Sequence, residues 1–285
     1  MTFTTRFAPS PTGPLHLGHA YSAILAHDMA RDAGGRFLLR IDDIDQTRAR
    51  AHWVTQIEQD LTWLGLTWDG EPWHQSDHLP EYRSVLDRLT ARGLTYPCSC
   101  KRRDIESAAA APQEGVPSHG PDGRIYPGTC RHRPMSDLQP GDAIRLDLAR
   151  ALPATLPAFT ETGPAHAGVH PVTPDHLQTH IGDPVLARPN MAASYHLSVV
   201  IDDAAQSVTH VIRGEDLFEA SFLHVALQTI LNLPTPIYHH HALIRDEQGR
   251  RLAKRDDARA IATYRDAGLS PMDIRNMLPL PSLRL

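Results

Sequence analysis

Apolar and polar positions follow one another near the start of the chain in a pattern that predicts strands alternating with helices. Short apolar runs of strand length cover residues 5–8 and 37–41. Helical periodicity covers residues 19–31, 48–64 and 81–91, and a glycine follows each of these segments. Strands that alternate with helices in this way predict a parallel sheet in an α/β fold.

The pattern changes between residues 96 and 189. This stretch contains all three cysteines and is rich in proline and glycine, so we expect it to form an inserted subdomain. Beyond it we predict strands over 195–201, 208–212 and 237–244, a helix over 217–231, and short helices over 258–267 and 271–277. The expected organisation is two halves of a catalytic domain in residues 1–95 and 190–245, the insertion in 96–189, and a C-terminal segment in 246–285.

Net charge, cysteine count and the length of apolar runs narrow the classes of protein to which the chain can belong. The formal net charge is −5, so the overall charge does not indicate a nucleic-acid binder, although a basic stripe is compatible with it. An odd count of three cysteines argues against a disulfide framework. Neither a signal peptide nor an apolar run long enough to span a bilayer is present. We therefore expect a cytoplasmic protein without a membrane partner.

The first chemical motif lies where the first strand meets the first helix. Residues 8–19 form a turn rich in proline and glycine that ends in His16, Leu17, Gly18 and His19. A helix N-terminus favours phosphate, and a glycine there lets a nucleotide approach the backbone. The pattern predicts an ATP site at His16, Gly18 and His19. The alternative is a turn with two surface histidines, in a chain that contains 18 histidines.

These residues resemble the glutamyl/glutaminyl branch of the class I aminoacyl-tRNA synthetases. The resemblance extends to the blocks at 6–13, 16–19, 40–45, 195–203 and 211–216. It implies a Rossmann-type parallel sheet with an inserted zinc-bearing subdomain and a short C-terminal helical segment. It also implies that ATP binds as its Mg²⁺ complex and that His16 and His19 act in catalysis.

A second motif at residues 251–255 resembles the mobile lysine loop of the same family. Only two lysines occur in the chain, and one of them, Lys254, stands where that loop requires a lysine. Arg251 and Ala253 depart from the family's reference form. The resemblance implies that Lys254 binds ATP and acts in catalysis, whereas the alternative is a solvated basic turn. His239, His240 and His241 are interpreted as strand-end residues that lead to this loop.

The family resemblance also implies a pocket for L-glutamate. An arginine fork suits a carboxylate because it donates two parallel hydrogen bonds. The residues that match the glutamate-binding positions of the family are Arg6, Ala8, Ser10, Asp42, Tyr195 and Arg213. Asp42 stands where the family usually has glutamate, which receives the substrate amino group. Aspartate is shorter, so this contact is direct or is bridged by water.

Three cysteines have the spacing of metal ligands. Cys98, Cys100 and Cys130 suit a tetrahedral zinc ion, which requires a fourth ligand. Tyr126 is the fourth ligand by resemblance to the short relatives of glutamyl-tRNA synthetase, and His132 is the chemically ordinary alternative. We therefore expect one structural Zn²⁺, the remaining possibility being reduced thiols without metal.

Only 31 of the 285 residues follow Lys254, so we expect no anticodon-binding domain. In length, in its shortened end and in its zinc pattern the chain resembles the glutamyl-Q tRNA(Asp) synthetase family. The resemblance implies tRNA-independent activation of glutamate and its transfer to queuosine in the anticodon stem-loop of tRNA(Asp). We expect the protein to be a monomer. The nearest alternative is a truncated glutamyl-tRNA synthetase that charges a tRNA 3′ end. A small-molecule nucleotidyltransferase and a non-catalytic zinc-bearing RNA-binding module are more distant alternatives.

Overall fold

The computed structural model describes residues 2–108, 119–121, 123–244 and 259–281. The predicted lysine loop, including Lys254, lies outside the described residues. The first half of the expected catalytic domain contains β1 (Thr4–Phe7), α1 (Leu17–Asp32), β2 (Arg36–Ile41), α2 (Ala51–Trp63), β3 (Trp73–His74), the 3-10 turn η1 (Gln75–His78) and α3 (Leu79–Ala91). This order confirms the predicted alternation of strands and helices.

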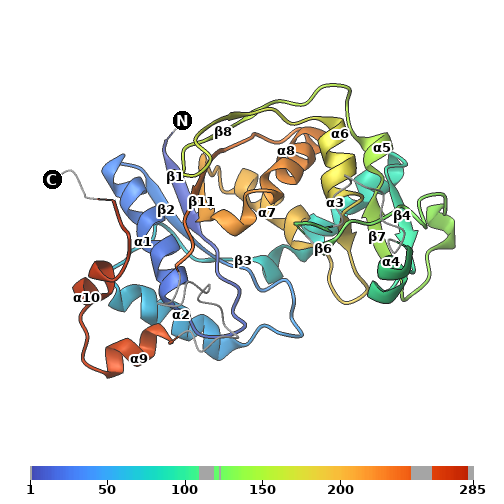
Figure 1. Cartoon of the computed structure of the whole chain (residues 1–285). Coiled ribbons are helices and arrows are strands. Elements are labelled where there is room, and N and C mark those ends of the chain that lie inside the picture. Colours follow the sequence, from blue (N-terminus) through green and yellow to red (C-terminus); the bar gives the residue numbers. More distant parts are fainter. Residues whose placement is uncertain (1, 109–118, 122, 245–258, 282–285) are drawn as a thin grey trace.

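A parallel sheet forms the centre of the molecule (Figure 1). β1 pairs with β2, with Thr4 opposite Arg36, and β2 pairs with β3. β11 (His210–Gly214) pairs in parallel with β12 (Ile237–His241). The two groups of strands meet where Thr209 N–H donates to Thr4 O at 3.0 Å, which places β11 beside β1. The strand order reverses between β1 and β11, and a crevice at the carboxyl ends of such strands is the usual ligand site of an α/β sheet.

The segment between the two halves contains a separate antiparallel sheet of β4 (Thr95–Cys98), β7 (Ala143–Leu146) and β10 (Val185–Ala187). Its other elements are α4 (Arg102–Ala108), β5 (His119–Gly120), β6 (Gly123–Arg124), η2 (Met135–Asp137), α5 (Leu148–Ala151), β8 (Phe159–Glu161), β9 (Gly168–His170), α6 (Pro174–His176) and the π-helical turn η3 (Leu177–Ile181). β8 and β9 lie within the expected insertion, yet β8 pairs in parallel with β12 of the central sheet.

The second half begins with a helix where a strand was expected. The sequence predicts a strand over residues 195–201, and this prediction is wrong because the segment belongs to α7 (Tyr195–Ala205). Ser194 caps the helix, since its hydroxyl accepts from Leu197 N–H. Most residues of the first two turns are buried, so their apolar run has no clear periodicity that would separate a buried helix from a buried strand.

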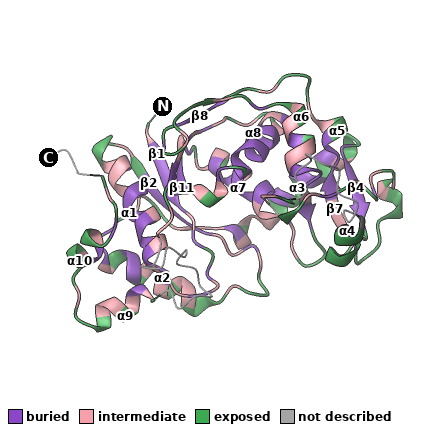
Figure 2. Ribbon diagram, in the orientation of Figure 1, coloured by how far each residue is buried: buried purple, intermediate pink, exposed green. Residues whose placement is uncertain are grey.

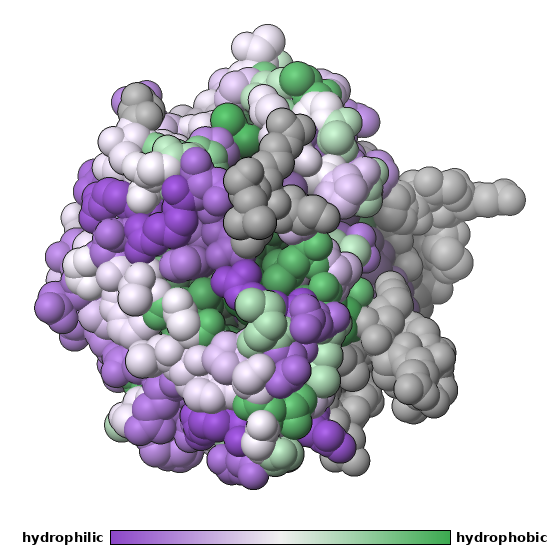
Figure 3. Space-filling view, turned by 90° about the vertical axis from the view of Figure 1, so that its left-hand side faces the viewer, coloured by the Kyte–Doolittle hydropathy of each residue, from purple (hydrophilic) through white to green (hydrophobic). Residues whose placement is uncertain are grey.

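The remaining predictions for this half are confirmed, with the strand predicted over 208–212 shifted by two residues and the other elements shorter than predicted. The elements are η4 (Glu215–Leu217), α8 (Ala220–Leu231), α9 (Ile261–Asp266) and α10 (Pro271–Asn276), in addition to β11 and β12. Buried residues concentrate in the sheet and in α7 and α8 (Figure 2). The face that carries α2, α9 and α10 mixes polar with scattered apolar residues (Figure 3). Among the described helices, none combines the length and apolar character needed to cross a membrane.

Candidate active site and cysteine cluster

A cavity of about 390 Å³ opens at the carboxyl ends of β1 and β11. Every predicted ATP-site and glutamate-site residue that the structure describes lines it: Arg6, Ala8, Ser10, His16, Gly18, His19, Asp42, Tyr195 and Arg213. These residues come from segments that are far apart in the sequence, and the reversal of strand order brings them together. Lys254 lies outside the described residues.

His16 and His19 form the N-terminal cap of α1. The Nδ1 atom of His16 accepts from Gly18 N–H at 3.1 Å, and the Nδ1 atom of His19 accepts from His16 N–H at 3.2 Å. Neutral rings that accept at Nδ1 carry their protons at Nε2. A Cβ atom at position 18 would lie 3.0 Å from Cε1 of His16, so a side chain there would crowd the capping ring. The N–H groups of His16 and Gly18 are therefore already used within this helix N-terminus.

Buried charges form one wall of the cavity. Arg6 Nε donates to Asp203 Oδ1 at 2.9 Å, and Arg40 Nη1 donates to the same oxygen at 2.7 Å. Arg40 Nε donates to Asp42 Oδ1 at 3.0 Å. Burial would raise the pKa of Asp203, but Arg6 and Arg40 hold it below its ordinary value. Two of the arginines at the site are therefore neutralised by carboxylates of the chain.

Asp42 differs from Asp203 in its electrostatics. Burial raises the pKa of Asp42 to about 6, because the charge of Arg40 only partly offsets the loss of hydration. Asp202 is held by Tyr82 Oη and Gln75 Nε2, each at 2.7 Å, and adds a nearby negative charge. No specific role was predicted for Arg40, Asp202 or Asp203. The available signal was their occurrence as polar residues inside otherwise apolar segments.

Arg213, the last residue but one of β11, and Tyr195, the first residue of α7, also line the cavity. Arg213 Nη1 lies 3.4 Å from Tyr195 Oη. Its other contacts are with uncharged groups, among them the carbonyl oxygen of Leu217 and the hydroxyl of Ser221. A buried guanidinium that is surrounded by uncharged acceptors favours an anionic ligand, because buried charges require a partner of opposite charge.

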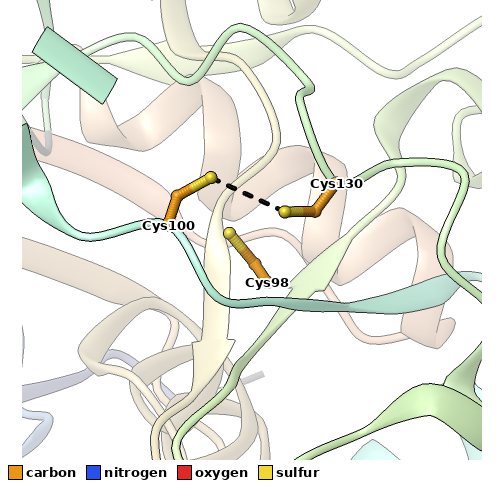
Figure 4. Close-up of side chains that lie close together, drawn as sticks. All are labelled: Cys98, Cys100 and Cys130. Carbon is orange, nitrogen blue, oxygen red and sulfur yellow. Dashed lines mark hydrogen bonds between the residues drawn. The ribbon is translucent and has the colours of Figure 1, made fainter. Parts of the chain in front are cut away.

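The three cysteines meet beside β4 in the inserted segment (Figure 4). The sulfur atoms of Cys98, Cys100 and Cys130 all lie within 4.8 Å of one another, and those of Cys100 and Cys130 are 3.6 Å apart. These thiols are reduced. Burial raises the pKa of Cys100 to about 11. Burial also acts to raise the pKa of Cys130, but hydrogen bonds, that of Tyr126 foremost, hold it at about 6. Three converging thiols form a donor set that suits zinc.

Tyr126 lies against this cluster. Its hydroxyl oxygen is 3.4 Å from the sulfur of Cys98 and 3.7 Å from that of Cys100, and it accepts from Cys130 N–H at 2.8 Å. His132 is exposed, and among the described residues it does not belong to the group of potential metal ligands. The geometry therefore favours Tyr126 over His132 as a fourth ligand.

Comparisons with known proteins agree with this geometry. The family described as tRNA synthetases class I (E and Q), catalytic domain, matches residues 2–150 and 157–283. The glutamyl-Q tRNA(Asp) synthetase of Rhodobacter capsulatus is 62% identical over 97% of this chain and 99% of its own length. That of Symbiobacterium thermophilum is 42% identical over 93% of this chain and 82% of its own.

A solved structure is similar in fold. It is a glutamate tRNA ligase from Elizabethkingia meningosepticum in complex with its amino acid, with a TM-score of 0.69 and 25% identity. The match covers 90% of this chain but only 53% of the ligase, so the chain spans about half the length of that enzyme. The full-length match is instead with the shorter relatives. The chain belongs to the class I tRNA synthetases of the glutamyl and glutaminyl group and, within them, to the glutamyl-Q tRNA(Asp) synthetase family of ligases.

Proposed function

We propose that this chain activates L-glutamate with ATP in the absence of tRNA and transfers it to the queuosine base in the anticodon loop of tRNA(Asp). One observation carries the proposal. The predicted ATP and glutamate residues that the structure describes surround a single cavity, in a chain that matches a glutamyl-Q tRNA(Asp) synthetase over 97% of its length. A monomeric state and a cytoplasmic location stay predictions.

For glutamate, the two walls of the cavity have different roles. Arg213 and Tyr195 receive a carboxylate of the substrate, since the arginine contacts only uncharged groups. Asp42 receives the substrate ammonium group, and Ser10 lines the same cavity. Arg6 is already paired with Asp203, so it contributes hydrogen bonds and position more than net charge.

For ATP, the cap of α1 supplies the phosphate contacts. The Nε2–H groups of His16 and His19 donate to phosphate oxygens, and Lys254 adds a cationic charge as pyrophosphate leaves. A carboxylate oxygen of glutamate attacks the α-phosphorus, and the bond from that phosphorus to pyrophosphate breaks. A hydroxyl of queuosine then attacks the carbonyl carbon of the adenylate and loses its proton. AMP leaves with the electron pair of the broken carbon–oxygen bond.

One zinc ion would be held by Cys98, Cys100, Cys130 and Tyr126. The support is the convergence of three sulfurs and one phenolic oxygen at the edge of β4. A closed set of four ligands leaves no open position for substrate, which is typical of a structural site. The ion would fix the loop around Cys130 against β4.

Two measurements test the proposal. Glutamate-dependent exchange of pyrophosphate into ATP should occur with the protein alone. Labelled glutamate should then be transferred to tRNA(Asp) that contains queuosine but has lost its 3′-terminal nucleotide, and not to the same tRNA without queuosine. If only tRNA with an intact 3′ end accepts glutamate, the chain charges the 3′ end and the proposal is wrong.

A further inference from the structure

Three neighbouring strands carry a buried chain of polar side chains that ends at Arg213. Glu161 is on β8, His240 on β12 and Arg213 on β11, and the register places Arg213 opposite His240. Glu161 and His240 are each 1% exposed and Arg213 is 6% exposed. Such a row of polar groups in the centre of a sheet is costly unless every hydrogen bond is made.

The direction of these hydrogen bonds fixes the proton of His240. Arg213 Nε–H donates to His240 Nε2 at 3.0 Å. Because a guanidinium has only donors, His240 Nε2 must be an acceptor and the ring proton lies on Nδ1. That proton is donated to Glu161 Oε2. The other oxygen of Glu161, Oε1, accepts from the backbone N–H groups of Gly163 and His240.

Gly163 makes this arrangement possible. A Cβ atom at this position would collide with the carbonyl oxygen of His240 and would lie 2.7 Å from Oε1 of Glu161. The backbone of the turn after β8 can therefore donate to Glu161 only if residue 163 is glycine. The carboxylate is thus held from two sides and presents Oε2 to the histidine ring.

A second imidazole faces Arg213 in the same way. Arg213 Nη1 donates to His224 Nδ1 at 3.1 Å, and His224 Nε2–H donates to His196 Nδ1 at 2.9 Å. Burial, with the charge of Arg213, keeps the pKa of His224 well below its ordinary value, which agrees with a neutral ring.

All acceptors around Arg213 are consequently uncharged: His240 Nε2, His224 Nδ1, Tyr195 Oη, Ser221 Oγ and the carbonyl oxygen of Leu217. The longest of these contacts, 3.4 Å, is with Tyr195. Within the described ranges, Arg213 forms no ion pair, whereas Arg6 and Arg40 both pair with Asp203. The site therefore fixes the guanidinium in place without neutralising it by direct contact.

We propose that Glu161 and His240 are positioning residues that hold Arg213 ready for a carboxylate of the substrate glutamate, by keeping the proton of His240 on Nδ1. The proposal rests on the proposed function, in which Arg213 receives that carboxylate. Neither Glu161 nor His240 is among the residues that line the cavity, so both act through Arg213.

The substitution Glu161→Gln tests this by changing one atom. The two backbone donors retain the amide oxygen at the Oε1 position, so the amide NH₂ faces His240 Nδ1. The ring must then accept at Nδ1 and carry its proton on Nε2, where it opposes Arg213 Nε–H. We expect the KM for glutamate in pyrophosphate exchange to rise by about tenfold or more, because a hydrogen bond to a charged group is lost. The KM for ATP should stay within about twofold, within the scatter of changes that leave a site intact.

A matched pair of variants at His240 separates positioning from folding. His240→Gln keeps an acceptor for Arg213 and should retain most of the affinity for glutamate, whereas His240→Leu removes the acceptor and should raise the KM. In the His240→Gln background, Glu161→Gln should have little further effect on the KM for glutamate, because no ring proton remains to be moved.

Nitrogen-15 spectra of histidine-labelled protein should show Nε2 of His240 unprotonated in the wild type and protonated in Glu161→Gln. The His240→Gln spectrum identifies the signal.

Thermal unfolding of each variant provides the control for folding. Equal KM values for glutamate in folded His240→Gln and His240→Leu would overturn the proposal, as would an unchanged KM in folded Glu161→Gln. If Glu161→Gln does not fold, the pair at His240 decides. Failure of the proposed function would be seen differently, as absence of glutamate-dependent exchange in the wild-type protein.

Discussion

Arg6 and Asp203 form a buried ion pair in which Nε of the arginine lies 2.9 Å from Oδ1 of the aspartate. Arg40 donates to the same oxygen at 2.7 Å. Arg6 is on β1, Arg40 on β2 and Asp203 on α7. One carboxylate therefore joins the first half of the catalytic domain to the second, at the wall of the cavity.

Asp203→Asn should lower the free energy of unfolding by about 3–5 kcal/mol, because buried Arg6 loses its carboxylate and buried Arg40 loses one of the carboxylates that it contacts. Urea unfolding at pH 7 measures this. The matched control is Glu106→Gln in the exposed pair with Arg102, which should cost about 0.3–0.5 kcal/mol. A loss below about 1 kcal/mol at Asp203 would contradict the assigned role, since that is the range of surface pairs.

The same pair predicts a pH dependence of stability. The folded-state pKa of Asp203 is lowered, so its contribution is present above the unfolded pKa of about 3.9 and is lost as pH falls through the lower folded value. The difference in stability between wild type and Asp203→Asn should therefore be constant near neutral pH and shrink in acid. A difference that grows as pH falls below 4 would have the wrong sign for this ion pair.

Asp42 should make glutamate activation sensitive to pH near 6. Its pKa is raised to about 6, so the side chain is neutral below that pH and charged above it. Burial is the main cause of the raised pKa, to which the charge of Asp202 adds, while the charges of Arg40 and Arg6 act to lower the pKa. Since a carboxylate attracts the substrate ammonium group, kcat/KM for glutamate should rise with pH through about 6. Asp42→Asn should be lower in activity and should lose this step, while an identical step in the variant would assign it to another group.

The sequence was sufficient to predict the parts of the fold and site that depend on local patterns. The strand, turn and helix around His16 have clear signals in periodicity and in glycine and proline positions. The three clustered cysteines have the spacing of metal ligands. In contrast, α7 is buried on several sides, so its apolar run has the appearance of a strand.

The partners of Arg213 were outside the reach of local reasoning. His240 faces Arg213 because of the register between β11 and β12, and Glu161 reaches His240 because β8 adds to the same sheet. In the sequence, β9, α6, η3, β10 and α7 separate residue 161 from residue 213. Long-range pairing of this kind is set by packing, and periodicity within one segment contains no information about it.

The cysteine cluster leads to a prediction of metal content. Purified protein should contain one zinc per chain, and Cys98→Ser should lose it. Tyr126→Phe should weaken zinc binding by a factor of about ten to a hundred, the range found even for groups that only orient ligands. His132→Ala should retain the metal, because His132 is exposed and lies outside the cluster. If only His132→Ala loses zinc in competition with a chelator, the assignment of Tyr126 is wrong.

Lys254 should act mainly on the chemical step. In the proposed function its charge meets the negative charge that develops as pyrophosphate departs, so its loss should affect the transition state more than the bound ground state. Lys254→Ala should slow single-turnover formation of the adenylate by about a hundredfold, roughly 3 kcal/mol, while the Kd for glutamate changes little. The chain offers a matched control, because Lys101 is its only other lysine and precedes α4 in the inserted segment. Lys101→Ala should leave the single-turnover rate unchanged. An unchanged rate in Lys254→Ala would remove the lysine loop from the mechanism, and equal losses in both variants would indicate an effect of net charge instead of a contact with the leaving phosphates.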